Sequence, residues 1–167
     1  MSGLKFMSGK GLKGALAAAA LLGTLPAVAT TASADEIRVT IERVKGIGPG
    51  DVWSRSDFFA RVTIGGVTTT TDVVRNQNDA RPNWIVVRDV RRGTHDVKIE
   101  ILDRDVTKQE PIDITKTTGK KDLDFKVSPR PCRVIGFAGS PRCGRSIVRT
   151  GSEGKSAEIT FKVEARR

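Results

Sequence analysis

The stretch "VKIEILDRD", Val97 to Asp105, alternates apolar and polar residues and then ends in two aspartates. Alternation with a period of two predicts a half-buried β-strand. Asp103 and Asp105 stand two residues apart where that strand is expected to end. In a strongly basic chain, such carboxylates are either solvated loop residues or ligands of a cation. The end of this predicted strand therefore raises the question of what the protein binds.

The same alternation returns along the chain after residue 35. Clear strands are predicted in "EIRVTIERV" (36–44), "WIVVRDV" (84–90) and "SAEITFKVEA" (156–165). Residues 57–74 predict a hairpin, because two glycines between β-rich runs form a two-residue turn. Weaker strands, among them "IDITKTT" (112–118), raise the count to about eight, and no amphipathic helix is predicted. The prediction is all-β, an eight-stranded antiparallel Greek-key sandwich.

The N-terminal segment has the layout of a secretory signal peptide. Three lysines precede the apolar run "GALAAAALLGTLPAVA", and the small residues of "TASADE" follow it. A charged region, an apolar region and a small-x-small exit are the features of such a peptide. A membrane anchor is the alternative, although a spanning helix needs about 20 apolar residues. We expect residues 1–34 to be removed after Ala34, or after Ala29 at a second candidate site, from a secreted, extracellular protein of residues 35–167.

The charge of the chain favours anionic partners. It has 29 Lys and Arg against 19 Asp and Glu, a net charge of +10. Without Lys5, Lys10 and Lys13 there are 26 basic residues against 19 acidic ones, which leaves +7 for residues 35–167. Anionic lipid and cell-envelope polymers are the expected partners. Tyrosine is absent and other aromatic residues are few, so no stacking surface for nucleic acid is expected.

The cysteines and the single histidine do not predict a catalytic centre. Cys132 and Cys143 are close in sequence and predict a disulfide in an exported protein. A metal-binding or catalytic thiol pair is the alternative, but no second group of Cys or His stands nearby. His95 lies in the turn "RRGTHD", a poor place for an oriented Ser-His-Asp arrangement. Phosphate-cradling and zinc-binding motifs are absent, and we expect the protein not to be an enzyme.

Five carboxylates fall in two of the predicted loops. Asp51 and Asp57 follow the first strand, whereas Asp103, Asp105 and Glu110 follow "VKIEIL". If the sheet order brings both loops to one end, these charges repel one another. A calcium ion relieves that repulsion, because it takes six to eight oxygen ligands from carboxylates, carbonyls and water. The alternatives are that Asp57 caps or turns the strand and that Asp103 and Asp105 are solvated.

Three motifs, in this order, resemble those of the C2 domain family, eight-stranded Greek-key sandwiches that bind lipid with calcium. "SDFFARVTIGG" is similar to the family's Ser-Asp-Pro-Tyr-Val-Lys-Val, and "RPNW" to its Asn-Pro-x-Trp. "VKIEILDRD" is similar to its strand ending in Asp-x-Asp. The resemblance runs from Glu36 to about Ile114 and returns in "GSEGKSAEITFKVEA". It implies that calcium sits between the first and third loops and bridges to anionic phospholipid headgroups.

The resemblance also implies a set of site residues. Those that match calcium ligands by position are Asp51, Asp57, Asp103, Asp105 and Glu110. Val52 and Trp53 lie beside Asp51 in the first loop and are candidates for peripheral membrane contact, since Trp is favoured at membrane interfaces; simple packing is the alternative.

The sequence departs from the family pattern in several places. Phe58 and Phe59 replace Pro-Tyr, position 110 is Glu instead of Asp, and no acid follows Trp84. A disulfide-bearing insertion around 128–150 has no counterpart in the family's motifs. Two other hypotheses therefore stand: a structural, adhesive or protein-binding sandwich without metal, and a small hydrolase or protease inhibitor that uses "CRVIGFAGSPRC".

Overall fold

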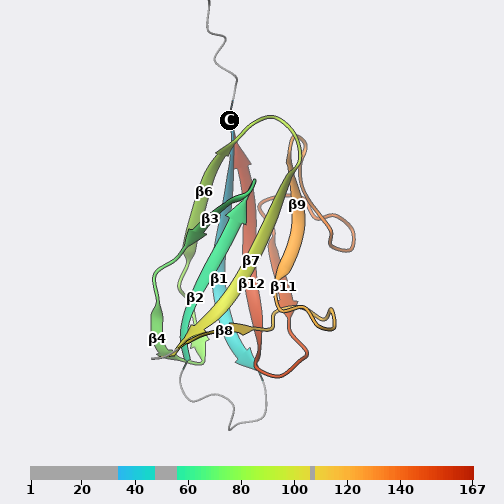
Figure 1. The fold of residues 1–167 in the computed structure, drawn as a ribbon. Helices are drawn as coiled ribbons and strands as arrows, with labels where there is room; N and C mark the ends of the chain where they lie inside the picture. Colours follow the sequence, from blue (N-terminus) through green and yellow to red (C-terminus); the bar gives the residue numbers. More distant parts are fainter. Residues whose placement is uncertain (1–33, 48–55, 106–107) are drawn as a thin grey trace, which may run out of the picture. The chain divides into compact units, whose positions relative to one another are not determined.

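The computed structural model describes residues 34–47, 56–105 and 108–167 (Figure 1). In this described part the chain forms twelve β-strands and no helix. It therefore also has no helix long and apolar enough to cross a membrane. The predicted signal peptide, apart from Ala34, lies outside the described residues, as do Asp51, Val52 and Trp53 of the first loop.

One sheet is built around the two longest strands. Its strands are β1 (Asp35–Ile47), β5 (Asp79–Ala80), β6 (Trp84–Val90), β11 (Ser146–Thr150) and β12 (Ser156–Arg166). They follow the order β11-β12-β1-β5, and β6 also pairs with β1. β1 and β12 pair in antiparallel orientation from Glu36 opposite Arg166 to Ile47 opposite Ser156, with one register shift between Ile41 and Arg43. This sheet joins the first and last strands of the described chain.

The second sheet contains the strand predicted in "VKIEILDRD". Its strands are β2 (Ser56–Ile64), β3 (Val67–Thr70), β4 (Val74–Gln77), β7 (His95–Arg104), β8 (Gln109–Ile112), β9 (Leu123–Pro129) and β10 (Cys132–Ile135). The order is β10-β9-β7-β2-β3, with β4 beside β2 and β8 beside β7. Gly65 and Gly66, at φ values of 57° and 85°, make the predicted two-residue turn between β2 and β3. A positive φ at both positions is what this kind of hairpin turn requires.

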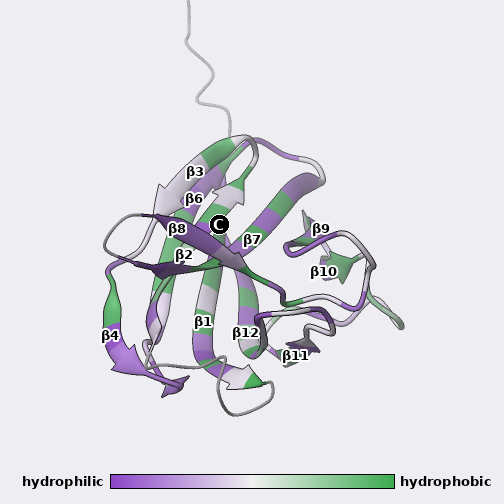
Figure 2. Ribbon diagram, turned by 60° about the horizontal axis from the view of Figure 1, so that its bottom comes forward, coloured by the Kyte–Doolittle hydropathy of each residue, from purple (hydrophilic) through white to green (hydrophobic). Residues whose placement is uncertain are grey.

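Alternating apolar residues from both sheets meet in one core. Figure 2 shows the alternation as green and purple bands along the long strands. Ile37, Val39 and Ile41 of β1 are buried, and Ile99 and Ile101 of β7 are buried with them. Because side chains alternate across a strand, these positions share the inner face. The predicted all-β antiparallel sandwich is confirmed; the additional strands are short ones such as β5, which leave no periodic signal.

The strand predicted over 112–118 was wrong beyond its start. β8 ends at Ile112, and residues 114–122 form no strand. The Asp113 carboxylate accepts a hydrogen bond from the Thr115 amide at 2.9 Å. Such local side-chain bonds give the backbone an alternative to the ladder. Ile112 and Ile114 are both buried. The alternation of apolar and polar residues in this segment therefore reflects burial of the isoleucines and not a strand.

Candidate functional site

The topology brings four of the predicted site residues to one end of the sandwich. β2 starts where β7 ends, with Phe58 opposite Asp103, so that Asp57 is the next residue. β8 then returns along β7 and places Glu110 opposite Asp103. This end lies at the bottom of Figure 1, where β2, β7 and β8 meet. We call it the loop end, defined by Asp57, Asp103, Asp105 and Glu110 and the side chains that contact them.

Asp103 is the buried member of this group. It continues the inward-facing series of Ile99 and Ile101, and only 2% of the residue is exposed. Its Oδ1 accepts the Asp57 amide at 2.7 Å, and its Oδ2 forms an ion pair with the Lys155 ammonium. A buried carboxylate is costly unless it is paired and hydrogen-bonded. Asp103 meets both conditions within the protein itself.

Asp57 has a structural contact of its own. Its Oδ1 accepts the backbone amide of Asn76 at 3.0 Å. Asn76 has a φ of 56°, in the left-handed region that Asn tolerates better than most residues. Asp57 therefore helps to hold β4 beside the start of β2, which agrees with the alternative in which this aspartate supports a turn.

Glu110 and Asp105 lie toward solvent. Lys108 forms an ion pair with Glu110, and its hydrogen bond and charge lower the pKa of the Glu110 carboxyl. The same contact raises the pKa of Lys108. Asp105 is exposed, and its amide donates to the Lys108 carbonyl at 3.0 Å. Together these contacts close the turn between β7 and β8.

The described residues do not by themselves form a calcium cage. Within residues 34–47, 56–105 and 108–167, no three Asp, Glu, His or Cys side chains are grouped closely enough to hold a metal ion. The ammonium of Lys155 occupies the Oδ2 side of Asp103. Asp51, the remaining candidate ligand, lies outside the described residues. The calcium site stays a prediction.

Lys155 was not predicted from the sequence, and its loop is held by a second buried aspartate. Asp113 is fully buried, and its Oδ2 accepts the amides of Ser152 and Glu153, each at 2.7 Å. The Asp113 amide donates to the Lys155 carbonyl at 2.9 Å. Charge-assisted hydrogen bonds of this kind are stronger than neutral ones. Asp113 therefore fixes the backbone from which Lys155 reaches Asp103.

Gly151 allows this loop to approach Asp113. A Cβ at position 151 would lie 2.1 Å from the Asp113 carbonyl oxygen, so a side chain does not fit without movement of the backbone. The Gly151 amide also donates to the Ala157 carbonyl at 3.0 Å. Two features of the sequence could have indicated this arrangement. Asp113 stands between two isoleucines, and the segment "GSEGK" has a glycine at position 151 and another at position 154.

The cysteines and the histidine are found in structural roles. Cys132 and Cys143 form the predicted disulfide, with their Cα atoms 5.4 Å apart. The His95 Nε2 donates to the Arg91 carbonyl at 2.6 Å and so closes the turn that leads into β7. This agrees with the interpretation of His95 as a turn residue.

Solved structures that match this fold include C2 domains, at low sequence identity. A C2 domain of a plant extended synaptotagmin 1 matches with a TM-score of 0.53 and 12% identity, over 78% of this chain and 93% of that one. The calcium-bound structure of two C2 domains of extended synaptotagmin 2 matches with a TM-score of 0.56 and 12% identity, over 78% of this chain and 45% of that one. A human GIVD cytosolic phospholipase A2 matches with a TM-score of 0.54 and 13% identity, over 80% of this chain.

These comparisons establish a C2-like β-sandwich fold. The chain spans only 17% of the phospholipase, so that enzyme's activity is not transferred by the match. No protein-family model matches the sequence, and no curated protein matches it. The resemblance drawn from the three sequence motifs is confirmed at the level of the fold.

Proposed function

We propose that this protein is an exported C2-like module that binds anionic surfaces and does so without calcium. The observation that carries the proposal is the ion pair between Lys155 and the buried Asp103. In a site of converging carboxylates, a cation is needed to offset their mutual repulsion. Here the protein supplies that cation from its own chain. Anionic phospholipid is the first candidate surface, and a polyanionic cell-envelope polymer is the second.

The charges around the loop end support the same function. Glu110 is neutralised by Lys108. Arg75 and Arg104 are exposed, and neither has a carboxylate partner among the residues that the structure describes. Each cationic side chain near an anionic membrane contributes about 1 kcal/mol of attraction. With a net charge of +7 over residues 35–167, the loop end need not acquire a metal to approach an anionic surface.

Vesicle sedimentation tests the proposal. Phosphatidylserine-containing vesicles should retain the protein in the presence of EGTA, and phosphatidylcholine vesicles should not. Because the attraction is electrostatic, retention should fall at high salt. A double variant Arg75→Gln/Arg104→Gln should be retained less than the matched control Arg91→Gln/Arg92→Gln, in which the substituted arginines lie in the turn between β6 and β7.

Two results would contradict this function. Retention that appears only when calcium is added would mean that the metal is required. No retention on phosphatidylserine, together with no binding to an immobilised anionic envelope polymer, would favour a structural or protein-binding sandwich.

Calcium binding is the second candidate function, and one observation favours it. The amide of Asp57 donates to the Asp103 carboxylate at 2.7 Å, and Glu110 lies opposite Asp103 on the next strand. In this candidate function the Lys155 ammonium leaves the Asp103 carboxylate when calcium binds. The calcium ligands are then Asp51, Asp57, Asp103, Asp105 and Glu110. Val52 and Trp53 then contact the membrane. A calcium-bound protein is among the structural neighbours, and the competition between calcium and Lys155 is directly testable.

Export is part of the proposed function. Cleavage after Ala34 would leave Asp35 as the first residue, and Asp35 is already buried at the start of β1 with its carboxylate paired to Arg130. Intact-mass analysis of protein from the medium should therefore give a chain that begins at Asp35, or at Thr30 if the upstream site is used. A mass that still includes Met1 to Ala29 would contradict export with cleavage.

A further inference from the structure

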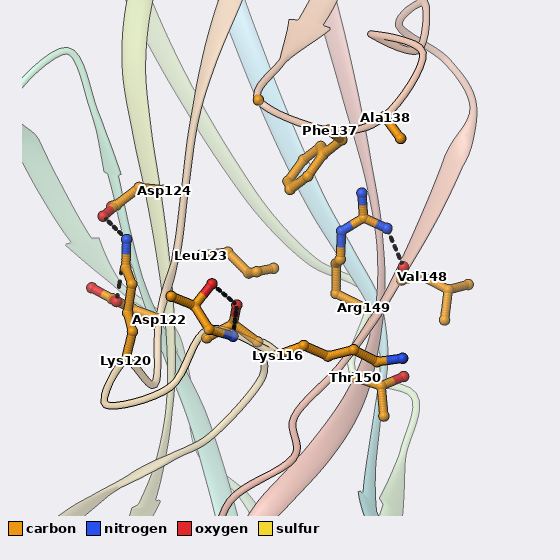
Figure 3. A pocket seen from close by; sticks show the side chains of 13 residues that line it. Lys116, Lys120, Asp122, Leu123, Asp124, Phe137, Ala138, Val148, Arg149 and Thr150 are labelled. Atoms are coloured by element: carbon orange, nitrogen blue, oxygen red, sulfur yellow. Dashed lines mark hydrogen bonds and ion pairs between the residues drawn. The ribbon is translucent and has the colours of Figure 1, made fainter.

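A cleft of about 470 Å³ opens between β9 and β11, away from the loop-end residues described above (Figure 3). Its side chains come from the segment between β8 and β9, from β9 itself, from the segment after β10 and from β11. The residues that matter for its chemistry are Lys116, Leu123, Phe137, Arg149 and Thr150. We call it the Arg149 cleft.

The guanidinium of Arg149 is held in place from two sides. It lies 4.1 Å above the centroid of the Phe137 ring, and its Nη1 donates to the Val148 carbonyl at 2.9 Å. Phe137 in turn packs on the core, with ring centroids 5.2 Å from Phe125 and 6.1 Å from Phe161. Stacking on an aromatic ring and a backbone hydrogen bond orient the guanidinium before any ligand arrives. Its remaining N–H groups are available to an acceptor in the cleft.

The acids in this cleft are already paired with other cations. Asp122 lies 2.7 Å from the Lys98 ammonium, and Asp124 forms an ion pair with Lys120. Among the described residues, no carboxylate pairs with Arg149 or with Lys116. Burial lowers the pKa of the Arg149 guanidinium, but an arginine stays charged in proteins. A half-buried cation without a carboxylate partner favours the binding of an anion.

We propose that the Arg149 cleft binds a phosphate group. The planar fork of a guanidinium matches two phosphate oxygens, and a lysine adds a point charge. Lys116 and the Thr150 hydroxyl lie on the same rim as Arg149 (Figure 3). Donors from two segments of the chain, the one after β8 and β11 itself, suit a tetrahedral oxyanion better than a flat carboxylate. The apolar surface of Leu123 and Phe137 is suited to the carbon part of a phosphoester.

The disulfide-bearing insertion builds one wall of this cleft. Cys132 and Cys143 close the segment that carries Phe137. Inside it, the Ser140 amide donates to the Phe137 carbonyl at 3.0 Å, and the Val134 amide donates to the Pro141 carbonyl at 2.9 Å. These bonds position the ring on which Arg149 stacks. The insertion thus has a role that does not depend on the proposed loop-end function.

Isothermal titration of the oxidised protein with inorganic phosphate at constant ionic strength tests the proposal. We expect saturable binding that Arg149→Gln weakens by about tenfold or more, equivalent to about 1.4 kcal/mol, as is typical for a lost charged hydrogen bond. Lys116→Gln should weaken it by a smaller factor. Arg92→Gln removes the same charge from an exposed turn and should leave phosphate affinity within about twofold of the parent.

The proposal is overturned if phosphate shows no saturable binding, or if Arg149→Gln and Arg92→Gln lower affinity equally. Near-UV circular dichroism of Arg149→Gln shows whether the variant is folded, and if it is not, Lys116→Gln, which changes an exposed residue, serves in its place. Vesicles with phosphatidic acid distinguish the source of the phosphate. Arg149-dependent retention on them supports a lipid headgroup, and phosphate binding without such retention supports a soluble phosphoester.

Discussion

The ammonium of Lys155 forms an ion pair with the carboxylate of Asp103, although 52 residues of sequence separate them. The side chains are 20% and 4% exposed, respectively. Asp103, which the sequence pattern suggests as a calcium ligand, is thus already paired with a cation of the protein itself. The pair connects the end of β7 to the loop before β12 and offsets part of the negative charge at the loop end.

Replacing Lys155 should reveal any capacity of the loop end for calcium. Lys155→Met leaves Asp103 buried without its cation and should lower the free energy of unfolding by about 3 kcal/mol, as expected when one member of a buried pair is lost. Calcium should then raise the melting temperature of the variant more than that of the parent, since an ion that binds only the folded state stabilises it.

The control for this experiment is Lys108→Met, which removes an exposed lysine from the same end. It should change stability little. If millimolar calcium changes the melting temperature of neither the parent nor Lys155→Met, these carboxylates bind no calcium. An equal shift in both proteins would show that Lys155 does not compete with the ion.

The buried carboxylate of Asp113 should be among the most sensitive positions outside the apolar core. Asp113→Asn loses one charged acceptor for the amides of Thr115, Ser152 and Glu153. Because the substitution removes a charged acceptor from a fully buried position and leaves part-buried donors without it, we expect a loss of about 2 kcal/mol in urea unfolding. Asp96→Asn, at a carboxylate that is 81% exposed, should lose almost nothing. Equal stability of the two variants would argue against this role for Asp113.

Gly151→Ala tests the close approach of the loop to Asp113. The new Cβ would meet the Asp113 carbonyl oxygen at 2.1 Å, so the backbone must move. We expect a destabilisation of about 2–3 kcal/mol by thermal or chemical unfolding. Ser152→Ala in the same loop should be close to neutral, since Ser152 uses its backbone amide for Asp113. If Gly151→Ala is as stable as the parent, the loop can accept a Cβ at position 151 without destabilising the fold.

Removing the disulfide should affect both stability and the Arg149 cleft. The double variant Cys132→Ser/Cys143→Ser loses the constraint on the unfolded chain, which contributes about 3 kcal/mol for a short loop. Phe137 should also be less well positioned, so phosphate affinity should fall even where the variant remains folded. Calorimetry and phosphate titration of the same sample check both effects. Unchanged phosphate affinity would show that the insertion does not organise the cleft.

The ion pair between Arg43 and Asp79 predicts a weak acid dependence of stability. Arg43 donates to Asp79 from Nε at 2.7 Å and also from Nη2, and these hydrogen bonds lower the pKa of the Asp79 carboxyl. Because the folded pKa is below the ordinary value of about 3.9, the contribution is complete above that value and is lost as the pH falls through the folded pKa.

Melting temperatures measured from about pH 5 downward should therefore fall less steeply for Asp79→Asn than for the parent. The difference should be small and should shrink in high salt, because the pair is exposed and screened. If the melting temperatures of the parent and Asp79→Asn fall in parallel with pH at low salt, the Arg43–Asp79 pair does not contribute to stability. The matched control is Asp72→Asn, which changes an exposed aspartate that has no ion pair among the described residues, and its melting curve should follow that of the parent.

The longer strands of this protein could be predicted from its sequence, because the period of a strand is a local property. The alternation in "VKIEIL" and "SAEITFKVEA" and the turn at Gly65 and Gly66 each depend on a few consecutive residues. The hydrophobic pattern then assigns an inner face to each strand. The disulfide was also predictable, since it joins cysteines that are close in the sequence. These local signals were sufficient for the fold class.

Only the tertiary structure decided which charges meet. That Asp103 lies inside while Asp105 lies outside depends on the pairing of β7 with β2 and β8. Lys155 reaches Asp103 because Asp113 holds its loop, and Arg149 becomes a candidate anion ligand because Phe137 supports it. Contacts between residues far apart in sequence have no periodic signal. Their energy depends on burial and geometry, which exist only after the chain has folded.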